Sequence, residues 1–542
     1  MPSQIVVVLS GPIAAGKTTL ADSLEKRFSF ARFKTRELIR TILGTEPARE
    51  ALQKAGEDLD RESNGTWVAA ALTKQILDAQ ATGPDGRILV DSVRLISQVE
   101  AIRNAFGRNV VHVHITAPYE ILARRYAARI ATIQELATYE HVKADPTEAQ
   151  VETLQDVADI VIDTSQATEE DVVIRVAARL GLYGRSVDQL VDVLVGGQYG
   201  SEGKGHIADH LAPEYDVLMR VGGPNAGHTV FEEPEPYVFH LLPSGTRRNT
   251  AAKIVLGAGM VLEVEQLLRE INQNEVPPER LTIDPQAMII DPGDIEFEKE
   301  WLRDTIGSTA QGVGSATSRK VLRTGAQFPV RLARDVPEFS RYLRPAVEIL
   351  EETFTRGQRV LLEGTQGTGL SLHHGNYAWV TSRDTTASGA LAEAGIGPCR
   401  VRKVVMVVRT YPIRVQNPPV DGATSGPMGR ELDWQDVSDR SGIPVDELRK
   451  KEKTSTTKKD RRVAEFDWAL LRRAATLNSP TDIALSFTDY LSIENRKARR
   501  YEQLTSPTLR FIEEIERVAI APVSLIVTRF AFRSIIDRRA WS

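Results

Sequence analysis

Two kinds of hydrophobic pattern alternate along the first third of the chain: continuous apolar runs and amphipathic stretches. Residues 5–9 form a continuous apolar run, IVVVL, which is typical of a strand buried on both faces of a parallel sheet. An amphipathic stretch at 18–28 follows it and predicts a helix. Further apolar runs at 87–90, 110–115 and 159–162 alternate with helical patterns. This order predicts βαβ units, and hence an α/β domain with a parallel sheet.

A second domain is predicted after a short polar segment. A helical pattern over 169–182 ends at residues 183–186, which read YGRS, and a new apolar strand at 191–195 runs into a glycine-rich turn. Two or more domains also follow from the length of 542 residues, because a single core stops growing near roughly 250–300 residues. The predicted parts are a first α/β domain at 1–183, a linker at 184–190 and a second α/β domain at 191–542.

The charge balance and the cysteine content exclude several classes of protein. Lys and Arg number 68 against 73 Asp and Glu, a net charge of -5, whereas sequence-independent nucleic-acid binding needs a concentrated basic surface. Cys399 is the only cysteine, which excludes an intrachain disulfide and a zinc site built from cysteines. The first residues lack the basic segment of a signal peptide, and the apolar runs are too short to span a bilayer. We therefore expect a cytoplasmic protein with neither a nucleic-acid nor a membrane partner.

The first glycine-rich loop carries a phosphate-binding motif. Residues 11–18 read GPIAAGKT and fit the pattern G-x-x-x-x-G-K-[ST] between a predicted strand and a predicted helix, as the motif requires. Gly11 and Gly16 would let backbone N–H groups turn toward a polyphosphate. Lys17 would reach the terminal phosphate oxygens, and Thr18 would ligate Mg²⁺ at the start of the helix. The motif therefore predicts an ATP-binding site.

Two groups of residues limit the types of reaction that this first domain could catalyse. Asp91 and Arg94 form a D-x-x-R element after a predicted strand, and one predicted helical segment carries Arg124, Arg125 and Arg129. Together with the phosphate loop, these residues resemble the nucleoside-monophosphate kinases, in which such groups hold donor and acceptor phosphates. The resemblance implies phosphate transfer to a nucleotide. The alternative for the three arginines is a solvated helix face.

A second glycine-rich loop follows the strand at 191–195. Residues 195–205 read VGGQYGSEGKG, so the backbone there could approach a nucleotide phosphate closely, although this spacing alone would equally fit a turn. Residues 222–229 read GGPNAGHT and place His228 among glycines. Further segments follow in order: HLLPSG at 240–245, IGST at 306–309, EGTQGT at 363–368, VTS at 380–382 and SFTD at 486–489. Together these segments resemble the adenylosuccinate synthetases, from about residue 191 to residue 533.

The resemblance implies a two-step reaction. A purine nucleoside triphosphate phosphorylates the 6-oxo group of IMP, and the amino group of L-aspartate then displaces that phosphate. His228 would be the general acid, and Lys204 would stabilise charge on the transferring phosphoryl group. The carbonyl of Gly227 would help to hold Mg²⁺. Arg323 matches an arginine that the family donates across a dimer interface, so the resemblance also implies a homodimer.

The other implied contacts fall into three sets. The nucleoside monophosphate would lie against Asn225, Thr309, Gln366, Leu370, Thr381 and Val415, with Gln366 counted among the catalytic residues. Nucleotide binding would also involve Gly200, Glu202, Gly203, Gly205, Ala226 and Asp489. Aspartate would be held by Thr456, Thr457, Lys459 and Arg461, where Lys459 stands in place of the family's arginine and keeps its charge but not its bidentate geometry.

Ser201 departs from the family's pattern. The family's loop reads G-D-E-G-K-G, and its aspartate is both the general base for N1–H and a Mg²⁺ ligand, whereas this chain has Ser201 there. A serine hydroxyl cannot act as that base at neutral pH. A phage branch of the family has the same kind of replacement and acts on dGMP, so we interpret Ser201 as a substrate switch toward dGMP or GMP. Two alternatives stay open: an enzyme that still uses IMP with another base, and a silenced domain that senses nucleotides beside an active kinase.

The segments expected near the donor base depart as well. The family selects guanine with T-K-L-D, whereas this chain keeps only the carboxylate, Asp489, in SFTD. Residues 527–530 read VTRF where the family has S-T-G-P. ATP or dATP is therefore as consistent with the sequence as GTP. The fusion suggests that the kinase-like domain phosphorylates a nucleotide that the synthetase-like domain makes or consumes.

Overall fold

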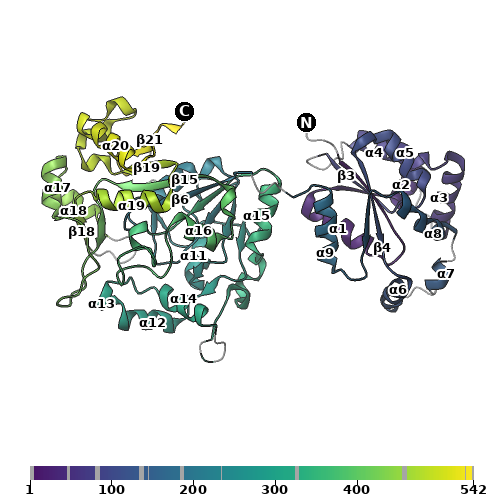
Figure 1. The fold of residues 1–542 in the computed structure, drawn as a ribbon, viewed down its shortest axis with the longest axis horizontal. Helices are drawn as coiled ribbons and strands as arrows, with labels where there is room; N and C mark the ends of the chain where they lie inside the picture. The colour runs from purple at the N-terminus through teal and green to yellow at the C-terminus, as the bar shows by residue number, and fades with distance from the viewer. Residues whose placement is uncertain are drawn as a thin grey trace. The chain divides into compact units, whose positions relative to one another are not determined.

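The computed structural model divides into two compact units, Met1–Tyr183 and Gly184–Ser542 (Figure 1). It describes residues 5–44, 49–79, 86–133, 139–143, 146–183, 188–232, 235–323, 327, 329–453, 460–531 and 533–539.

The first unit is built around a parallel sheet of five strands in the order β2-β3-β1-β4-β5. Alternate residues of the first strand face opposite sides of the sheet: Val7 and Leu9 belong to one apolar core, and Val6 and Val8 to the other. Helices cover both faces (Figure 1), which explains the uninterrupted apolar run. The strands are β1 (Ile5–Ser10), β2 (Ala31–Lys34), β3 (Arg87–Asp91), β4 (Val110–Thr116) and β5 (Ile160–Asp163).

The helices of the first unit follow the predicted alternation with the strands. The helix predicted over 169–182 ends at Arg179, because the chain turns at Gly181, whose φ is 67°. The three arginines 124, 125 and 129 share one helix, as predicted. The helices are α1 (Lys17–Phe28), α2 (Thr35–Leu43), α3 (Arg49–Ser63), α4 (Thr66–Ala79), α5 (Ile96–Phe106), α6 (Tyr119–Ile133), α7 (Tyr139–Lys143), α8 (Pro146–Val151) and α9 (Glu169–Arg179).

The second unit contains a sheet of nine strands in the order β12-β10-β7-β14-β6-β15-β19-β20-β21. Neighbouring strands are parallel except for the last pair, which is antiparallel. The strands are β6 (Val191–Gly196), β7 (Val217–Arg220), β10 (Lys253–Leu256), β12 (Leu281–Ile283), β14 (Val360–Glu363), β15 (Val401–Arg409), β19 (Asp482–Ser486), β20 (Val523–Val527) and β21 (Ile535–Asp537). Smaller sheets contain β8 (His228–Val230), β9 (Tyr237–Phe239), β11 (Val261–Leu262), β13 (Met288–Ile289), β16 (Ile413–Val415), β17 (Glu431–Leu432) and β18 (Arg461–Ala464).

Two apolar cores cover the faces of this large sheet. Val193 and Val195 of β6 point into one core, and Leu194 points into the other. The helices of the unit are α10 (Lys204–Leu211), α11 (Val264–Gln273), α12 (Pro292–Trp301), α13 (Arg303–Ile306), α14 (Val313–Leu322), α15 (Ala346–Thr355), α16 (Ala387–Ala394), α17 (Trp434–Ser441), α18 (Val445–Lys451), α19 (Trp468–Asn478) and α20 (Ser506–Ala519). The predicted class, an α/β protein with a P-loop sheet domain followed by a second α/β domain, is confirmed.

The sheet brings the predicted nucleotide-binding segments together. β7, β14 and β6 are neighbours, and Glu363 at the end of β14 lies opposite Arg220 on one side and Leu194 on the other. Because these strands are parallel, the loops after them leave from the same edge of the sheet, which is where open α/β sheets bind ligands. The glycine-rich loop after β6 and the polar segment after β14 therefore meet.

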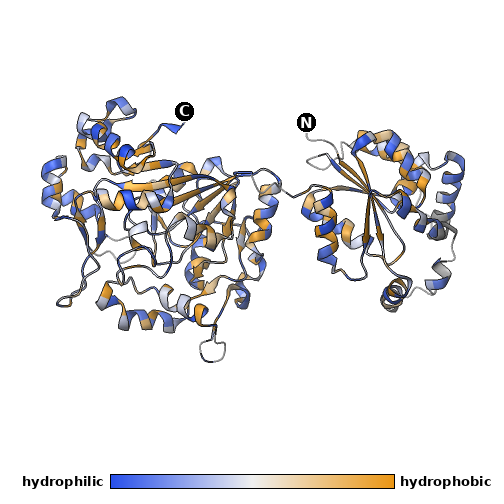
Figure 2. Cartoon of the chain, viewed as in Figure 1, coloured by the Kyte–Doolittle hydropathy of each residue, from blue (hydrophilic) through white to orange (hydrophobic). Residues whose placement is uncertain are grey.

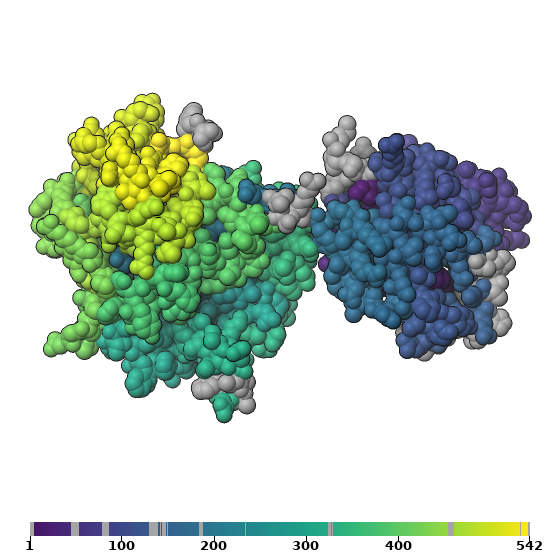
Figure 3. Space-filling view, in the orientation of Figure 1, coloured from purple at the N-terminus to yellow at the C-terminus, as the bar shows by residue number. Residues whose placement is uncertain are grey.

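Hydropathy follows this architecture. The strands of both sheets are mainly apolar (orange in Figure 2), and many helices carry one apolar and one polar face. On the face shown in Figure 3, the residues close to the C-terminus (yellow) lie against the green part of the second unit. Within the described ranges, no helix is long and apolar enough to cross a membrane.

Candidate functional site

The glycine-rich loop after β6 is held together by a buried carboxylate. Glu202 Oε1 accepts hydrogen bonds from the backbone N–H groups of Gln198 (3.0 Å) and Gly200 (2.8 Å), and its Oε2 lies 2.6 Å from Lys204 Nζ. Both charged side chains have no exposed area. Lys204 Nζ also donates to the carbonyl of Gly200 at 3.0 Å. Glu202 therefore shapes the loop from within and holds the ammonium group of Lys204 beside it.

Three glycines allow this loop to close onto its neighbours. Gly200 and Gly203 have φ values of 100° and 89°, and Gly203 caps α10. Gly205 lies on α10 against β8, where a Cβ atom would be 2.9 Å from the Cβ of His228 and 3.0 Å from the carbonyl oxygen of Thr229. The first turn of α10 therefore touches the strand that carries the predicted general acid.

His228 forms a buried pair with Glu363. Its Nδ1 and the Glu363 Oε1 atom are hydrogen-bonded, and Glu363 also accepts from the Ser244 hydroxyl (2.5 Å) and the Ser244 N–H (2.7 Å). Arg220 Nη1 lies 3.4 Å from the same carboxylate. Sequence reasoning assigned no role to Glu363, Arg220 or Ser244. One sequence feature could have indicated a role for Glu363: it is a charged residue at the end of an apolar strand, directly before Gly364.

The electrostatics of this pair determine the protonation state of the His228 imidazole. Burial, reinforced by the charge of Arg220, lowers the pKa of His228 to about 4. Burial would raise the pKa of Glu363, but Arg220 and the bonds from His228 and Ser244 outweigh it and lower that pKa to about 2. At neutral pH the ring is therefore neutral, and we assign its proton to Nδ1 because the Glu363 carboxylate can only accept. Within the described part of the chain, the buried Nε2 has no hydrogen-bond partner, so it is the atom that can meet a substrate.

Gln366 is fixed by a chain of polar contacts. Its φ is 58°, a left-handed conformation that a non-glycine residue rarely adopts, and its side chain donates to the Thr381 hydroxyl at 3.1 Å. The hydroxyl of Thr365 donates to Gln366 Oε1 at 3.3 Å and accepts from Arg383 Nη1 at 3.1 Å. Arg383 in turn pairs with Glu393 of α16 at 2.5 Å. Gln366 and Thr381, both predicted to contact the nucleotide, are thus in direct contact.

Other predicted nucleotide contacts lie on the segments that follow β7 and β14 and beside β16. Asn225 Oδ1 is buried and, among the described residues, has no partner, whereas the neighbouring carbonyl of Ala226 accepts from Arg220 Nη2 at 2.8 Å. Thr381 donates its N–H to the carbonyl of Leu370. The segment that carries Thr309 packs near β16, since a Cβ atom on Gly307 would be 3.7 Å from Val415. The structure therefore brings Gln366, Thr381 and Leu370 together, and places Gly307, two residues before Thr309, beside Val415.

Ser201 lies in the loop between Gly200 and Glu202 and is half-buried. Its carbonyl accepts a hydrogen bond from Arg409 Nη1 at 3.1 Å. Among the described residues, no side chain hydrogen-bonds its hydroxyl group, which leaves that group available to a ligand.

Asp489 is the retained carboxylate of the segment expected near the donor base. Its Oδ2 lies 3.0 Å from Arg496 Nε, and its Oδ1 is buried without a partner among the described residues. Burial raises the pKa of Asp489 despite the neighbouring arginine. A base N–H or amino group would supply the hydrogen bond that Oδ1 lacks.

Of the predicted aspartate-binding residues, Arg461 is described, and Thr456, Thr457 and Lys459 lie outside the described residues. Arg461 begins β18, its side chain is 15% exposed, and its Nη1 lies 3.2 Å from Glu452 Oε2.

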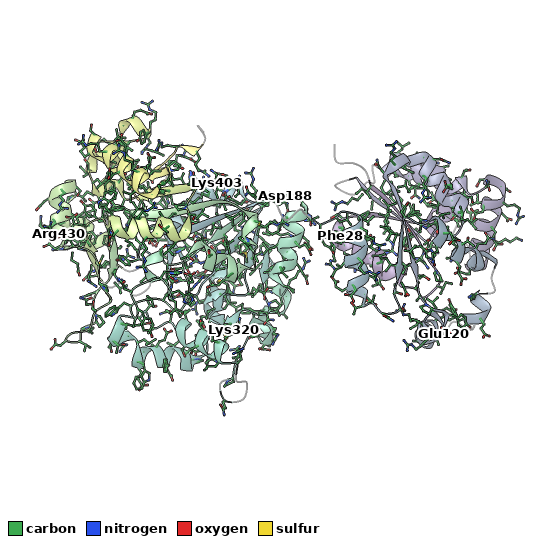
Figure 4. The ribbon with its side chains drawn as sticks, in the orientation of Figure 1. Phe28, Glu120, Asp188, Lys320, Lys403 and Arg430 are labelled. Carbon is green, nitrogen blue, oxygen red and sulfur yellow. The ribbon has the colours of Figure 1, made fainter. Side chains whose placement is uncertain are left out.

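Arg323 caps the C-terminal end of α14. It is exposed, as are its neighbours Val321 and Leu322, which are 66% and 50% exposed. The helix itself is fastened by Lys320, labelled in Figure 4, whose Nζ donates to the carbonyl of Gln286 at 2.6 Å. The end of α14 thus presents an arginine beside apolar surface.

The phosphate loop of the first unit has the expected shape. Gly11 has a φ of 140°, and a Cβ atom there would lie 2.1 Å from the carbonyl oxygen of Ile115, so only glycine fits. Gly16, with a φ of 104°, caps α1, whose first turn contains Lys17 and Thr18. Lys17 Nζ donates to the carbonyls of Gly11 (2.5 Å) and Pro12 (2.8 Å). A nucleotide phosphate would replace these carbonyl contacts.

The predicted arginines of this unit have different surroundings. Asp91 bonds to Arg32 and to the Ser92 hydroxyl, while Arg94 Nη1 donates to Glu148 at 2.5 Å. Arg125 donates to the side chain and the carbonyl of Thr164, both at 2.8 Å, and the Thr164 hydroxyl contacts the Ala15 carbonyl of the phosphate loop. Arg124 is exposed, and nothing is described of the Arg129 side chain. Arg125 is therefore tied to the loop, and Arg94 lies beside an acidic partner on α8.

Sequence reasoning missed a buried polar cluster beside this loop. The Ser10 hydroxyl lies 2.7 Å from His112 Nε2 and 2.9 Å from His114 Nδ1. Burial lowers the pKa of both histidines to about 4, with the charge of Lys17 contributing at His114. The sequence feature that could have indicated this cluster is a pair of histidines two positions apart in an apolar strand, because that spacing places both side chains on one face of the sheet.

Comparison with known proteins identifies the family of the chain that carries this site. The family model for adenylosuccinate synthetase matches residues 193–336 and 330–496. The chain is 36% identical over 354 residues to the adenylosuccinate synthetase of Pyrococcus sp. (strain ST700), covering 64% of this chain and 98% of the relative, and 36% identical over 352 residues to that of Archaeoglobus fulgidus, with the same coverage. The chain belongs to the adenylosuccinate synthetase family.

Solved structures agree with this assignment. The succinoaminodeoxyadenylate synthetase of cyanophage S-2L, solved with dGMP and with dATP as an energy donor, superposes with a TM-score of 0.54 at 28% identity, over 65% of this chain and 96% of that one. The adenylosuccinate synthetase of Plasmodium falciparum shares the fold, with a TM-score of 0.55 at 23% identity, over 65% of this chain and all of that one. The model of an AAA domain matches residues 7–145. The protein thus carries an adenylosuccinate synthetase domain, a ligase, fused to a P-loop kinase-like domain.

Proposed function

We propose that the adenylosuccinate synthetase domain joins L-aspartate to C6 of a purine nucleoside monophosphate, with dGMP or GMP preferred over IMP. The observation that carries the proposal is Ser201. It stands where the family's pattern has an aspartate, while Lys204 and the His228–Glu363 pair are complete. The smaller, uncharged serine leaves room near the purine and removes a negative charge. The solved cyanophage enzyme, whose described complex contains dGMP, supports the same substrate class.

The proposed chemistry has two displacements. The 6-oxygen attacks the terminal phosphorus of the donor, the nucleoside diphosphate leaves, and the purine N1 loses its proton. The amino group of aspartate then attacks C6, the 6-phosphate leaves, and the new C–N bond remains after the nitrogen loses a proton. The Ser201 hydroxyl can relay the N1 proton to water, because it both donates and accepts, but cannot store it at neutral pH. Lys204 balances charge on the moving phosphoryl group.

His228 acts on the 6-oxygen side of this reaction. Nε2 is the free ring atom, and the Glu363 carboxylate stabilises the imidazolium form through Nδ1. The pKa of about 4 applies to the buried ring without substrate. A phosphate dianion beside Nε2 would raise it, because opposite charge favours the protonated form. Substrate binding would thus prepare the ring to donate a proton.

The site offers neutral oxygen donors to Mg²⁺. Within the described residues, no group of three or more His, Cys, Asp or Glu side chains could hold a metal ion, and Glu202 is already paired with Lys204. The Gly227 carbonyl and the Ser201 hydroxyl fit a magnesium ion that arrives bound to the donor phosphates, since those phosphates supply the charge. Such an ion would neutralise the phosphate oxygens. In the first unit, Thr18 fits the same role.

The donor is proposed to be ATP or dATP, with GTP as the alternative. The unpaired Oδ1 of Asp489 can accept from the amino group of adenine or guanine. The family's lysine in this segment is replaced by Phe487, which removes one reason for choosing guanine. We also propose a homodimer, supported by the exposed Val321, Leu322 and Arg323 at the end of α14.

The kinase-like domain is proposed to transfer phosphate from ATP to a purine nucleoside monophosphate or its deoxy form. Its phosphate loop, with Gly11 fitted against β4 and Lys17 in the first turn of α1, supports ATP binding. Release of ADP by full-length protein should depend on the monophosphate supplied. If no purine monophosphate stimulates ADP release above the background of a Lys17→Ala variant, this assignment is wrong.

The deciding experiment for the ligase measures phosphate release and succino-product. Full-length protein is incubated with aspartate, Mg-ATP or Mg-GTP, and one of dGMP, GMP or IMP, and the products are identified by mass spectrometry. A Lys17→Ala variant removes the kinase background. We expect a succino-product from dGMP or GMP and not from IMP. Product from IMP alone would indicate that the domain catalyses the ordinary reaction of the family. No product from any of the three substrates would indicate a silenced, nucleotide-sensing domain.

A further inference from the structure

One buried carboxylate, Glu452, connects three segments that were each predicted to bind a different part of the substrates. Arg409 Nη2 donates to Glu452 Oε1 at 2.8 Å, and the hydroxyl of Tyr490 donates to the same oxygen at 2.7 Å. Arg461 Nη1 donates to Oε2 at 3.2 Å. Glu452 and Arg409 are 2% and 1% exposed, so this cluster lies in the interior.

Each contact leads to a different substrate-binding segment. The second terminal nitrogen of Arg409 donates to the carbonyl of Ser201, in the phosphate-binding loop. Tyr490 is the neighbour of Asp489 in the segment expected at the donor base. Arg461 is the described member of the predicted aspartate-binding set.

The main chain reinforces this arrangement. Lys453 and Asp460, next to Glu452 and Arg461 in sequence, form an isolated β-bridge, and Lys453 Nζ lies 2.6 Å from Asp460 Oδ1. Arg409 is additionally stacked over the ring of Phe487, with its guanidinium carbon 4.1 Å from the ring centroid. The arginine therefore has little freedom to move without moving the segments beside it.

The charges of this cluster are not balanced. Arg409 and Arg461 together face a single carboxylate. Burial would raise the pKa of Glu452, but the two arginines lower it to about 2, so the carboxylate is ionised at neutral pH. Burial raises the pKa of Tyr490 well above its ordinary value, so the phenol stays neutral. One positive charge is in excess, and an anion that meets Arg461 would compensate it.

We propose that Glu452 is a positioning residue that couples the aspartate site to the donor site, so that aspartate and the phosphoryl donor each strengthen the binding of the other. The inference rests on the proposed function, because it takes Arg461 as a ligand of aspartate. When a substrate carboxylate binds Arg461, the ion pair between Arg461 and Glu452 weakens. Glu452 then interacts more strongly with Arg409. Arg409 is then held more firmly and steadies the Ser201 carbonyl and the phosphate-binding loop. The coupling is reciprocal by thermodynamic necessity.

The test measures aspartate binding to full-length protein by titration calorimetry, with dGMP present and with or without the non-hydrolysable donor β,γ-imido-ATP. For the unchanged protein we expect the donor analogue to tighten aspartate binding about 10-fold. In Glu452→Gln the tightening should fall to less than twofold. The matched control is Glu465→Gln, which removes a carboxylate paired with Arg440 outside the cluster and should keep the full tightening.

A second variant covers the case in which Glu452→Gln does not fold. Arg409→Lys keeps the positive charge but cannot span the Ser201 carbonyl and Glu452 together. It should also reduce the tightening to less than twofold. Equal tightening in the unchanged protein and in the folded variants, or its absence from the unchanged protein, overturns the inference. Failure of the proposed function is recognised separately, as the absence of any succino-product from the unchanged protein whatever the binding data show.

Discussion

His228 and Glu363 form a hydrogen-bonded pair between two strands that are far apart in the sequence, with Nδ1 of the imidazole facing Oε1 of the carboxylate. The pair is buried, and Arg220 lies against the carboxylate from the side of β7. The carboxylate selects the tautomer with hydrogen on Nδ1, and it would stabilise the ring when Nε2 takes up a proton. The reactivity of His228 therefore depends on residues that the glycine-rich motif does not contain.

Glu363→Gln tests this dependence. The amide can still accept from Nδ1, but it carries no charge to stabilise an imidazolium and leaves Arg220 without its carboxylate. We expect kcat for succino-product formation to fall about 100-fold, in the range of general acid–base contributions, with little change in the KM for aspartate. Glu465→Gln is the control. A variant within twofold of the unchanged protein would show that Glu363 has no part in the reaction.

Gly205→Ala tests the contact between α10 and β8. The new methyl group would lie 2.9 Å from the Cβ of His228, so either the helix or the histidine has to shift. Because small displacements of reacting groups are costly, we expect kcat/KM to fall about 100-fold. Gly293→Ala is the matched control: it also lies in a helix, but a Cβ atom there has no neighbour within 4 Å. Equal activities of the two variants would contradict the prediction.

Lys17→Ala should separate the two activities. The ammonium group of Lys17 belongs to the phosphate loop of the first unit, and its loss removes the cation that meets the donor phosphates. Nucleotide-dependent ADP release without aspartate should fall at least about 100-fold, while aspartate-dependent succino-product should be unchanged. ADP release is measured in reactions without aspartate, and succino-product in matched reactions with aspartate. Parallel loss of both would mean that the two activities share this loop.

Acid should weaken the first unit through His112 and His114. The pKa of each ring is about 4 in the folded protein, below its ordinary 6.5. The unfolded chain therefore binds protons first, and stability is lost as the pH falls from about 6.5 toward 4, by about 3 kcal/mol per ring. Hydrogen exchange in β1 and β4, corrected for intrinsic rates, should show this loss between pH 7 and 4.5.

The control for the acid prediction replaces both rings. In a His112→Asn, His114→Asn double variant, protection of β1 and β4 should change much less between pH 7 and 4.5, even if its level at pH 7 is lower. An unchanged pH dependence would assign the acid sensitivity to other groups.

Much of the fold was accessible from local patterns. The apolar run that became β1 predicted a strand buried on both faces, and the structure places Val6 and Val7 in opposite cores. The boundary of α9 was less accurate, because the turn at Gly181 ends a helix whose apolar pattern continues to Leu182. The family was recognisable because many short segments occur in one order, and the match of residues 193–336 and 330–496 to the family model confirms it.

The sequence by itself determined the strands, the two phosphate loops and the replacement at Ser201, because these depend on neighbouring residues and on glycine's conformational freedom. Only the tertiary structure decided which charges meet. Glu363 reaches His228, and Glu452 gathers Arg409, Arg461 and Tyr490, across long separations in the chain. Such pairs leave no periodic signal in the sequence. They form because the ends of β14 and β15 carry Glu363 and Arg409 to one edge of the parallel sheet, where the smaller elements with His228, Glu452 and Arg461 pack against them, and because a buried charge needs a partner.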